Sequence, residues 1–549
     1  MGDEEQKVVM GSRSSSETES TNFELTIDEV IEDYVGAFGL SQMLNVLLVS
    51  LAWIFDAHST LVTIFSDAQP PGWRCKTGSC PSDHTHSSST HNSASISNVC
   101  GLVPGSWEWV NGRTSSTIAE WNLVCDRKFL AAIPASFFFL GSLIGSGVFG
   151  HLADSWLGRK RTVFVSCILT SITFLLTSFS PNVWVYALLR FANGFARSGI
   201  GISCIVLSTE AVGKKWRGQV SQYGFFLFTV GFLSLPVIAY PTRTHWRNLY
   251  RFLSIPPLSY AVLLLPFVSE SPRWFLVRGR SQEALAVLNR LARLNGKASI
   301  PNNVTLAKPS ATSEIAAAAA EDKGESLWRT KWAAKRMAIV MLAGFGVGFV
   351  YYGVQLNVEN LNISFYITVF INGLMEIPAV FIGSFFMGFS NRRLLFSVSA
   401  YIAGIACILC TLFSHKGGRD RGSMASKSKA PFNGNWGQLL VEAIGFLGAS
   451  LAFDILYGYS VELFPTNVRN FAVSMMRQAV MLGASMAPLL VVVGRLSPSL
   501  SYFVFGGLSL FSGVLTLWLP DTRNAPLYET LKQQQEQEKQ IQLSKQSAV

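Results

Sequence analysis

Residues 131–152 read AAIPASFFFLGSLIGSGVFGHL, an apolar run without a lysine, an arginine or a carboxylate. An α-helix rises 1.5 Å per residue, so a run of roughly 20 residues crosses the ~30 Å hydrocarbon core of a bilayer. Comparable runs recur along the chain, at 43–65, 163–179, 184–207, 220–240, 251–268, 337–356, 365–388, 394–413, 437–459, 471–493 and 500–519. Together they predict an all-α polytopic membrane protein with twelve transmembrane helices.

The composition supports a membrane protein. Of the 549 residues, 49% are hydrophobic and only 14% are charged, whereas soluble proteins carry roughly 25% charged residues. This balance excludes a large soluble enzyme with an apolar core, because too little polar surface remains to face water. Residues 1–35 are polar and acidic, so no cleavable signal peptide is expected.

Charged residues repeat at two helix junctions. Glu210 and Arg217 follow the fourth apolar run, and Glu462 and Arg469 follow the tenth with the same spacing. A repeat of this kind predicts two similar six-helix halves, the architecture of transporters that move one half against the other around a central site.

The apolar runs also predict the domain boundaries and the orientation. We expect an N-terminal tail (1–42), a first half (43–268) with a large loop (66–128), a central segment (269–336), a second half (337–519) and a C-terminal tail (520–549). Lysine and arginine are enriched after runs 2, 4, 6 and 8, which predicts that these connections and both tails are cytoplasmic. The loops after runs 5 and 9 are also basic and would suggest the opposite orientation. We follow the larger number of basic connections, those after runs 2, 4, 6 and 8.

The large loop carries four of the eight cysteines, namely Cys75, Cys80, Cys100 and Cys125. Four cysteines in one non-cytoplasmic loop predict two disulfides, and three pairings are open. The same loop contains three histidines, at His84, His86 and His91. They lack the close spacing of metal ligands and lie in a Ser/Thr-rich stretch, so no metal site is expected.

The connection after the second run reads Gly150-His-Leu-Ala-Asp154-Ser-Trp-Leu-Gly158-Arg159-Lys160-Arg161. It resembles the signature of the major facilitator superfamily, which implies that superfamily's fold. The resemblance, together with the repeat, suggests that a set of charged residues closes the cytoplasmic side when the protein faces outward. This set consists of Asp154, Arg159, Glu210, Arg217, Glu462 and Arg469.

Further motifs resemble the organic cation/carnitine transporters, especially their plant branch. They are Ile27-Asp28, Val35-Gly-Ala-Phe38, Glu120-Trp-Asn-Leu-Val-Cys125, Arg190-Phe-Ala-Asn-Gly194, Ser269-Glu-Ser-Pro-Arg-Trp274, Tyr351-Tyr-Gly353, Glu462-Leu-Phe-Pro-Thr-Asn-Val-Arg469-Asn470 and Pro520-Asp-Thr-Arg523. Sugar porters share several of these pieces but usually have a short first loop and paired glutamines in helix 7. Here helix 7 has the single Gln355. A proton-coupled sugar transporter is therefore the alternative.

Carboxylates within spanning helices are costly and mark functional sites. Four are found, at Asp56, Glu376, Glu442 and Asp454. Glu376 matches a helix 8 glutamate of the resembled family and is our first candidate for substrate binding, with Asp56 and Asp454 beside it. Aromatic rings attract cations, and the candidate walls are Tyr351, Tyr352, Tyr366, Tyr457 and Phe225.

Helix 11 departs from the resembled family. Animal relatives place an Asp or an Arg at the position occupied here by Met481, while Arg477 lies one helical turn earlier. Arg477 either holds a substrate carboxylate or neutralises Asp454. Asp56 and His58 are a candidate pair for proton coupling, although residues two apart do not share a helix face.

The sequence therefore predicts a secondary active transporter of small organic cations or zwitterions (carnitine, polyamine or choline-like) that works by alternating access. The expected partners are a small-molecule substrate and the lipid bilayer, with coupling to protons or sodium left open and no nucleic acid. No phosphate loop, His-Glu-x-x-His or Gly-x-Ser-x-Gly motif is found, so neither an enzyme nor a cofactor is expected. We expect a monomer in the plasma membrane, with the vacuolar membrane as the alternative.

Overall fold

The computed structural model describes residues 23–536, except 71, 77–98, 101–102, 104, 302–303, 307–326, 361–363, 388–389, 420–435, 496 and 523–530. Within these residues, twelve helices are long and apolar enough to span a membrane, which confirms the predicted number. Several helices extend beyond the apolar runs into charged residues. The seventh span, for example, begins at Lys331 rather than at 337, because helical hydrogen bonding does not end where hydrophobicity ends.

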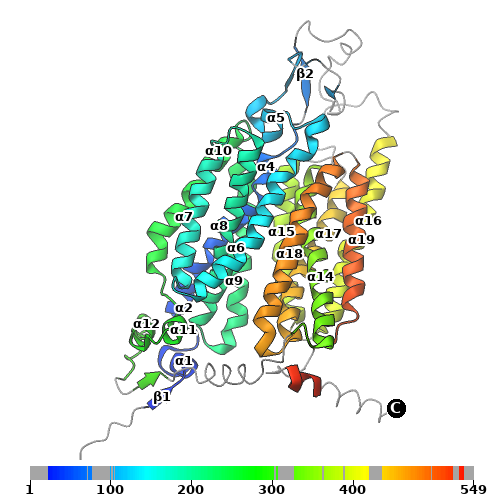
Figure 1. Ribbon diagram of the computed structural model, residues 1–549. Helices are drawn as coiled ribbons and strands as arrows, with labels where there is room; N and C mark the ends of the chain where they lie inside the picture. Colours follow the sequence, from blue (N-terminus) through cyan, green and yellow to red (C-terminus); the bar gives the residue numbers. More distant parts are fainter. Residues whose placement is uncertain are drawn as a thin grey trace, which may run out of the picture.

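The N-terminal half consists of α2 (Leu40–Ser50), α3 (Ala52–Leu61) and α4 (Thr63–Ser66), which form one span, then α6 (Ile133–Asp154), α7 (Arg159–Thr177), α8 (Val183–Glu210), α9 (Arg217–Ala239) and α10 (Trp246–Ser259). The sixth span continues through η7 (Tyr260–Leu264) and η8 (Leu265–Phe267). The C-terminal half consists of α14 (Lys331–Leu356), α15 (Phe365–Met387), α16 (Arg392–Arg419), α17 (Trp436–Leu463), α18 (Thr466–Gly494) and α19 (Pro498–Thr516). Figure 1 shows the two halves side by side.

Glycines allow the closest helix contacts inside each half. A Cβ on Gly194 of α8 would lie 1.9 Å from the Phe138 carbonyl oxygen of α6. In the C-terminal half, a Cβ on Gly348 of α14 would lie 2.1 Å from the Val480 carbonyl oxygen of α18. No side chain fits at either position. The helix backbones can therefore come into direct contact, as is common where small residues lie between membrane helices.

The two ends of the bundle differ in the segments that cover them. At the cysteine end, defined here by the described residues between 67 and 132, β2 (Trp73–Cys75) pairs antiparallel with β3 (Trp107–Trp109), followed by η4 (Arg113–Ser115), α5 (Thr117–Trp121) and η5 (Cys125–Ala131). Cys100 and Cys125 form a disulfide. Cys80, His84, His86 and His91 lie outside the described residues.

At the opposite end, called the basic end after Arg159–Arg161, a small layer lies against the N-terminal half (Figure 1). Its elements are β1 (Phe23–Leu25), α1 (Ile27–Val30), η1 (Ile31–Val35), α11 (Pro272–Val277), α12 (Ser281–Leu294) and β4 (Val304–Leu306). Strands β1 and β4 pair in parallel, with Phe23 opposite Val304. Two short helical turns, η6 (Lys214–Trp216) and η9 (Asn357–Asn360), and a helix at 531–536 complete the description.

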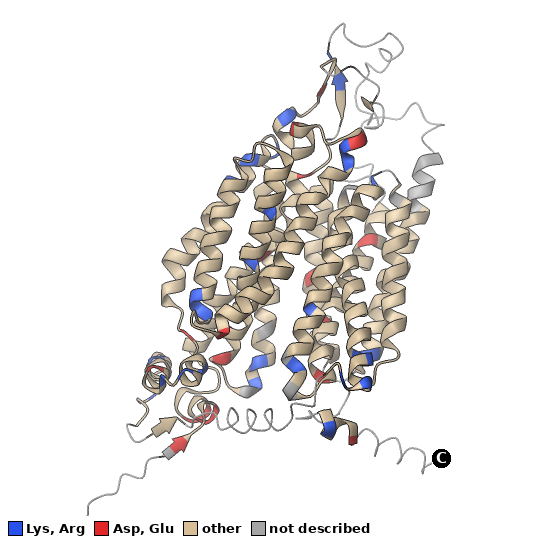
Figure 2. Cartoon of the chain, in the orientation of Figure 1, with Lys and Arg blue, Asp and Glu red and all other residues tan. Residues whose placement is uncertain are grey.

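Charge is concentrated at the two ends. Figure 2 shows most lysines, arginines and carboxylates at the ends of the helices and few along the spanning region. This distribution is expected where the helices contact lipid, because charged groups in hydrocarbon are costly. The few charges inside the bundle therefore require an explanation, and they lead to the candidate site.

The halves contact each other closely at the cysteine end. The Phe65 ring of α4 and the Tyr366 ring of α15 have centroids 5.3 Å apart, and Tyr240, which follows α9, packs on Tyr366 at 5.6 Å. Arg495 donates from Nη2 to the Asp67 carbonyl oxygen at 3.3 Å. Rings and a hydrogen bond thus join the two halves at this end.

Candidate functional site

A cavity lies between the two halves. Its walls come from α3, α8 and α9 of the N-terminal half and from α14, α15, α17 and α18 of the C-terminal half. All seven residues predicted to bind substrate line it, namely Asp56, Tyr351, Tyr352, Glu376, Asp454, Tyr457 and Arg477. Phe225, a candidate wall, lines it as well, whereas Tyr366 is among the rings of the cysteine end.

Glu376 of α15 is held by two hydroxyl groups. Thr229 of α9 donates to its Oε2 at 3.1 Å, and the Tyr351 hydroxyl of α14 donates to its Oε1. The side chain of Glu376 is buried, and it forms no ion pair with any described residue. The carboxyl group thus joins the two halves through Thr229 and remains without a basic partner.

Asp454 of α17 is the second cavity carboxyl group that forms no ion pair with a described residue. Its buried Oδ2 atom has no hydrogen-bond partner among the described residues. Glu376 is close enough to act on it electrostatically. Two neighbouring carboxyl groups without an arginine or lysine make this side of the cavity attractive to a cation.

Aromatic rings surround these two carboxyl groups. Tyr351 and Phe453 stack with centroids 4.7 Å apart, and Phe453 and Tyr457 follow at 5.1 Å. Tyr352 packs on Phe139 of α6 at 4.7 Å, across the boundary between the halves. The faces of such rings attract a desolvated cation by about 0.5–2 kcal/mol each.

The N-terminal side of the cavity contains a buried ion pair. Arg197 of α8 donates from Nη1 to Asp56 Oδ2 at 2.6 Å and to Thr60 Oγ1 at 3.0 Å. Arg197 was not singled out from the sequence, although an arginine in an apolar run is as unusual as a carboxylate. His58, the proposed partner of Asp56, instead bonds through Nε2 with Ser234 at 2.8 Å. The two side chains therefore have different partners.

Arg477 of α18 is the second cation of the cavity. A Cβ on Gly201 would lie 2.9 Å from its Nη2 atom, so the absence of a side chain at position 201 leaves room for the guanidinium group. Among the described residues, Arg477 forms no ion pair, and in particular none with Asp454. Of the two roles expected for Arg477, the geometry leaves it available for a carboxylate from outside the chain.

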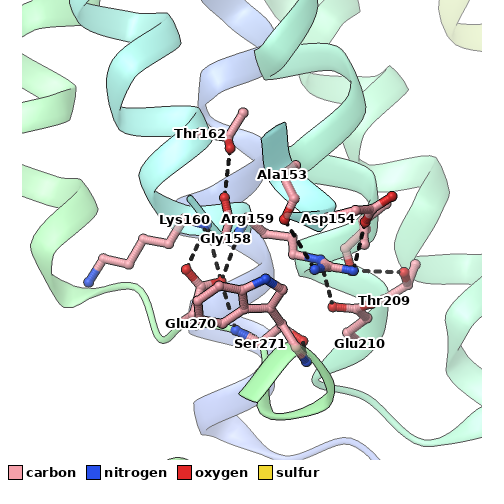
Figure 3. A network of polar contacts seen from close by, with 12 residues as sticks. Ala153, Asp154, Gly158, Arg159, Lys160, Thr162, Thr209, Glu210, Glu270 and Ser271 are labelled. Carbon is pink, nitrogen blue, oxygen red and sulfur yellow. Dashed lines mark hydrogen bonds and ion pairs between the residues drawn. The ribbon is translucent and has the colours of Figure 1, made fainter. Parts of the chain in front are cut away.

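The predicted gating residues cluster at the basic end. Arg159 pairs with Asp154 at 3.0 Å and with Glu210 at 3.5 Å, as Figure 3 shows. Glu270 accepts bonds from the backbone N–H groups of Arg159 and Lys160 at the start of α7. All the residues of this network belong to the N-terminal half or to the segment that directly follows it. The Asp154 side chain is 76% exposed, so it remains accessible to other groups.

The corresponding network of the C-terminal half is separate. Arg392 pairs with Glu462 at 3.0 Å, and Arg217 of the N-terminal half pairs with Asp28 instead. Arg469 donates from Nε to the Phe464 carbonyl oxygen at 3.2 Å, and burial lowers the pKa of its guanidinium. Among the described side chains, no ion pair at the basic end joins one half to the other.

Comparison with known proteins identifies the family of this chain. The family model described as "Sugar (and other) transporter" matches residues 83–532. The chain is 40% identical to organic cation/carnitine transporter 3 and 39% identical to organic cation/carnitine transporter 2, both of Arabidopsis thaliana. Each alignment covers 93% of this chain, together with 93% of the length of transporter 3 and 94% of the length of transporter 2.

A solved structure has the same fold. The inward open conformation of the xylose transporter XylE from E. coli superimposes with a TM-score of 0.58 at 15% identity, covering 88% of this chain and 97% of that one. The motifs of the sequence, the twelve-helix fold and these relatives agree. The chain is a multi-pass membrane transporter and belongs to the organic cation/carnitine transporter family of the major facilitator superfamily.

Proposed function

We propose that this protein is a secondary active transporter of small organic cations and zwitterions, and that the cavity between its halves binds the substrate. The observation that carries this proposal is the pair Glu376 and Asp454, two cavity carboxyl groups without a basic partner among the described residues.

The cation would occupy the side of the cavity formed by the C-terminal half. Glu376 and Asp454 supply negative charge, while Tyr351, Phe453 and Tyr457 supply ring faces. A quaternary ammonium group suits this arrangement, because it is large and weakly hydrated and needs no hydrogen-bond acceptors. Desolvated carboxylates attract it strongly in a low-dielectric site.

Arg477 extends the proposal to zwitterions. It lines the same cavity from α18 and has no carboxylate partner within the described chain. A substrate with an ammonium group and a carboxylate, such as carnitine, would satisfy Glu376 or Asp454 at one end and Arg477 at the other. Arginine suits this role because its planar fork binds a carboxylate through two parallel bonds.

A sugar transporter has less support. That alternative rested on motifs shared with sugar porters, which usually have paired glutamines in helix 7; here helix 7 has the single Gln355, and it is not among the residues that line the cavity. Sugars are neutral, so a sugar in this cavity would leave the two carboxyl groups of Glu376 and Asp454 uncompensated. The charges of the cavity favour a charged substrate.

Transport would proceed by alternating access. Ring contacts and Arg495 join the halves at the cysteine end, whereas the ion pairs at the basic end lie within each half. We therefore interpret this conformation as open toward the basic end. In the opposite conformation the basic end would be closed by contacts between the two halves. The α17–α18 junction, with Glu462 and Arg469, would then contact the charged residues of the N-terminal half, namely Asp154, Arg159, Glu210 and Arg217. The basic end would face the cytoplasm of a cell whose plasma membrane holds the protein, with the vacuolar membrane as the alternative.

Replacing Glu376 with glutamine should reduce uptake of organic cations by about 10- to 100-fold, since a contact between a charged group and its partner is worth about 1.5–3 kcal/mol. The glutamine keeps one carbonyl oxygen that can accept from Tyr351 or Thr229, presents an amide N–H group to the other hydroxyl oxygen, and removes the charge. Uptake of a radiolabelled quaternary ammonium compound measures the effect. Glu283→Gln, at an exposed ion pair of α12, is the matched control. Equal uptake by the Glu376 and Glu283 variants would contradict the site.

Replacing Arg477 with glutamine should separate zwitterions from simple cations. Carnitine uptake should fall by about tenfold or more through the loss of a carboxylate contact, while uptake of a quaternary ammonium compound without a carboxylate should change little. Arg477→Lys, which keeps the charge, should retain part of the carnitine uptake. If both substrates lose uptake equally in Arg477→Gln, the arginine has a structural role and does not select zwitterions.

Replacing Asp154 with asparagine should slow the cycle without affecting folding. The variant removes a charge that would contact the α17–α18 junction, so the maximal uptake rate should fall severalfold while membrane insertion and substrate binding persist. Asp126→Asn, an exposed carboxylate at the cysteine end, should behave like the unmodified protein. A normal maximal rate in Asp154→Asn would rule out a gating role for this residue.

A further inference from the structure

Glu442 of α17 and Asn372 of α15 form a buried polar pair outside the substrate cavity. Asn372 donates from Nδ2 to Glu442 Oε1 at 2.9 Å, and the two residues are 0% and 3% exposed. Asn372 precedes Glu376 by one helical turn. Glu442 precedes Phe446 by one turn, and the Phe446 ring stacks on Tyr351 at 5.6 Å. The pair therefore lies one turn from the cavity, on the side of the cysteine end.

Within the described parts of the chain, no cation compensates the Glu442 carboxyl group. The titratable side chains that face it are Cys407 and Cys410 of α16 and Tyr502 of α19. From α14 comes Tyr351, which donates to Glu376 instead. No lysine or arginine of the described residues pairs with Glu442. An ionised carboxylate here would be a lone charge at membrane depth, which is strongly disfavoured.

The atoms without partners indicate how the charge is avoided. Glu442 Oε2 and Asn372 Oδ1 are both buried, and neither has a hydrogen-bond partner among the described residues. Glu442 Oε2 is the second oxygen of the carboxyl group whose Oε1 accepts from Asn372. Asn372 Oδ1 is the carbonyl oxygen of the amide that makes this donation. A carboxylic acid and an amide can form two bonds at once, since the acid accepts from the amide N–H and donates its O–H to the amide oxygen.

We infer that Glu442 and Asn372 form a proton-binding site in the C-terminal half. One proton resides on Glu442 Oε2 and is donated to Asn372 Oδ1, so a single proton neutralises the charge and satisfies both unpaired atoms. No bond to carbon forms or breaks, and the proton is exchanged with water.

This site has a consequence for transport, which rests on the proposed function. The pair connects α15 to α17, the two helices that carry Glu376 and Asp454. Loss of the proton breaks the O–H···O bond and places a charge between these helices, so the two cavity carboxyl groups lose their relative position. Uptake should therefore fall as the pH rises, because only the protonated acid keeps the pair intact.

Infrared difference spectroscopy on the purified protein tests the site without any substrate. At neutral pH the carbonyl band of a protonated carboxylic acid should be present in the unmodified protein, absent in Glu442→Gln, and retained as the same band in Glu376→Gln and Asp454→Asn. Asn372→Val should shift this band, because the acid loses its amide partner. If Glu442→Gln removes only an ionised carboxylate band, the inference is wrong.

Transport and stability measurements complete the test. A glutamine at position 442 can form the same two bonds with Asn372, so Glu442→Gln should keep the unmodified Tm, while Glu442→Ala should lower it. Uptake by Glu442→Gln should lose the alkaline decline seen in the unmodified protein. A rise in Tm with sodium in the unmodified protein, absent in Glu442→Gln, would overturn the inference in favour of a sodium ion at these oxygens. Because the infrared result needs no transported compound, failure of this site and failure of the proposed function can be told apart.

Discussion

The cost of a buried charge in hydrocarbon is the constraint on which the rest of this structure depends. The bundle meets it in two ways and leaves two carboxyl groups without compensation among the described residues. Asp56 is neutralised by Arg197 at 2.6 Å. Glu442 shares a buried hydrogen bond with Asn372. Glu376 and Asp454 line the cavity and form no ion pair among the described residues, and Asp454 Oδ2 has no hydrogen-bond partner there either. The two carboxyl groups that need a positive charge thus lie at the cavity, where a bound cation could supply it.

The same constraint connects the site to the movement of the halves. Thr229 of the N-terminal half donates to Glu376 of the C-terminal half, so the carboxyl group that we propose to bind substrate is itself part of the contact between the halves. A cation that takes over Glu376 would compete with this hydrogen bond. Binding and rearrangement would then be linked through one side chain, with the ring contacts near Tyr366 as the barrier at the cysteine end.

Much of this arrangement was predictable from the sequence, for physical reasons. Hydrophobic runs of membrane length predict spans well, because the bilayer leaves few alternatives to a helix. The rule that intramembrane charges serve a function pointed to Asp56, Glu376, Asp454 and Arg477, and the structure places all four around one cavity. The resemblance to a family singled out Glu376, whose neighbourhood matched a known motif.

The partners of these residues were not predictable, because they depend on how distant helices pack. Asp56 and Arg197 are far apart in the sequence, and nothing local pairs them; His58, the nearer candidate, bonds with Ser234 instead. Arg197 does carry a signal in the sequence, because a cation within an apolar run is as costly in a membrane as a carboxylate. Glu442, like Glu376, is a carboxylate within an apolar run, yet it lies outside the cavity. A carboxylate in such a run indicates that its charge must be compensated, but the sequence does not show which group compensates it.

Saturable binding of a radiolabelled quaternary ammonium compound to the purified protein tests the central claim most directly. We predict saturable binding that excess unlabelled carnitine displaces and glucose does not, and that is lost when Glu376 and Asp454 are replaced together by glutamine and asparagine. Binding displaced by glucose, or unaffected by the double replacement, would contradict a cation site formed by these two carboxyl groups.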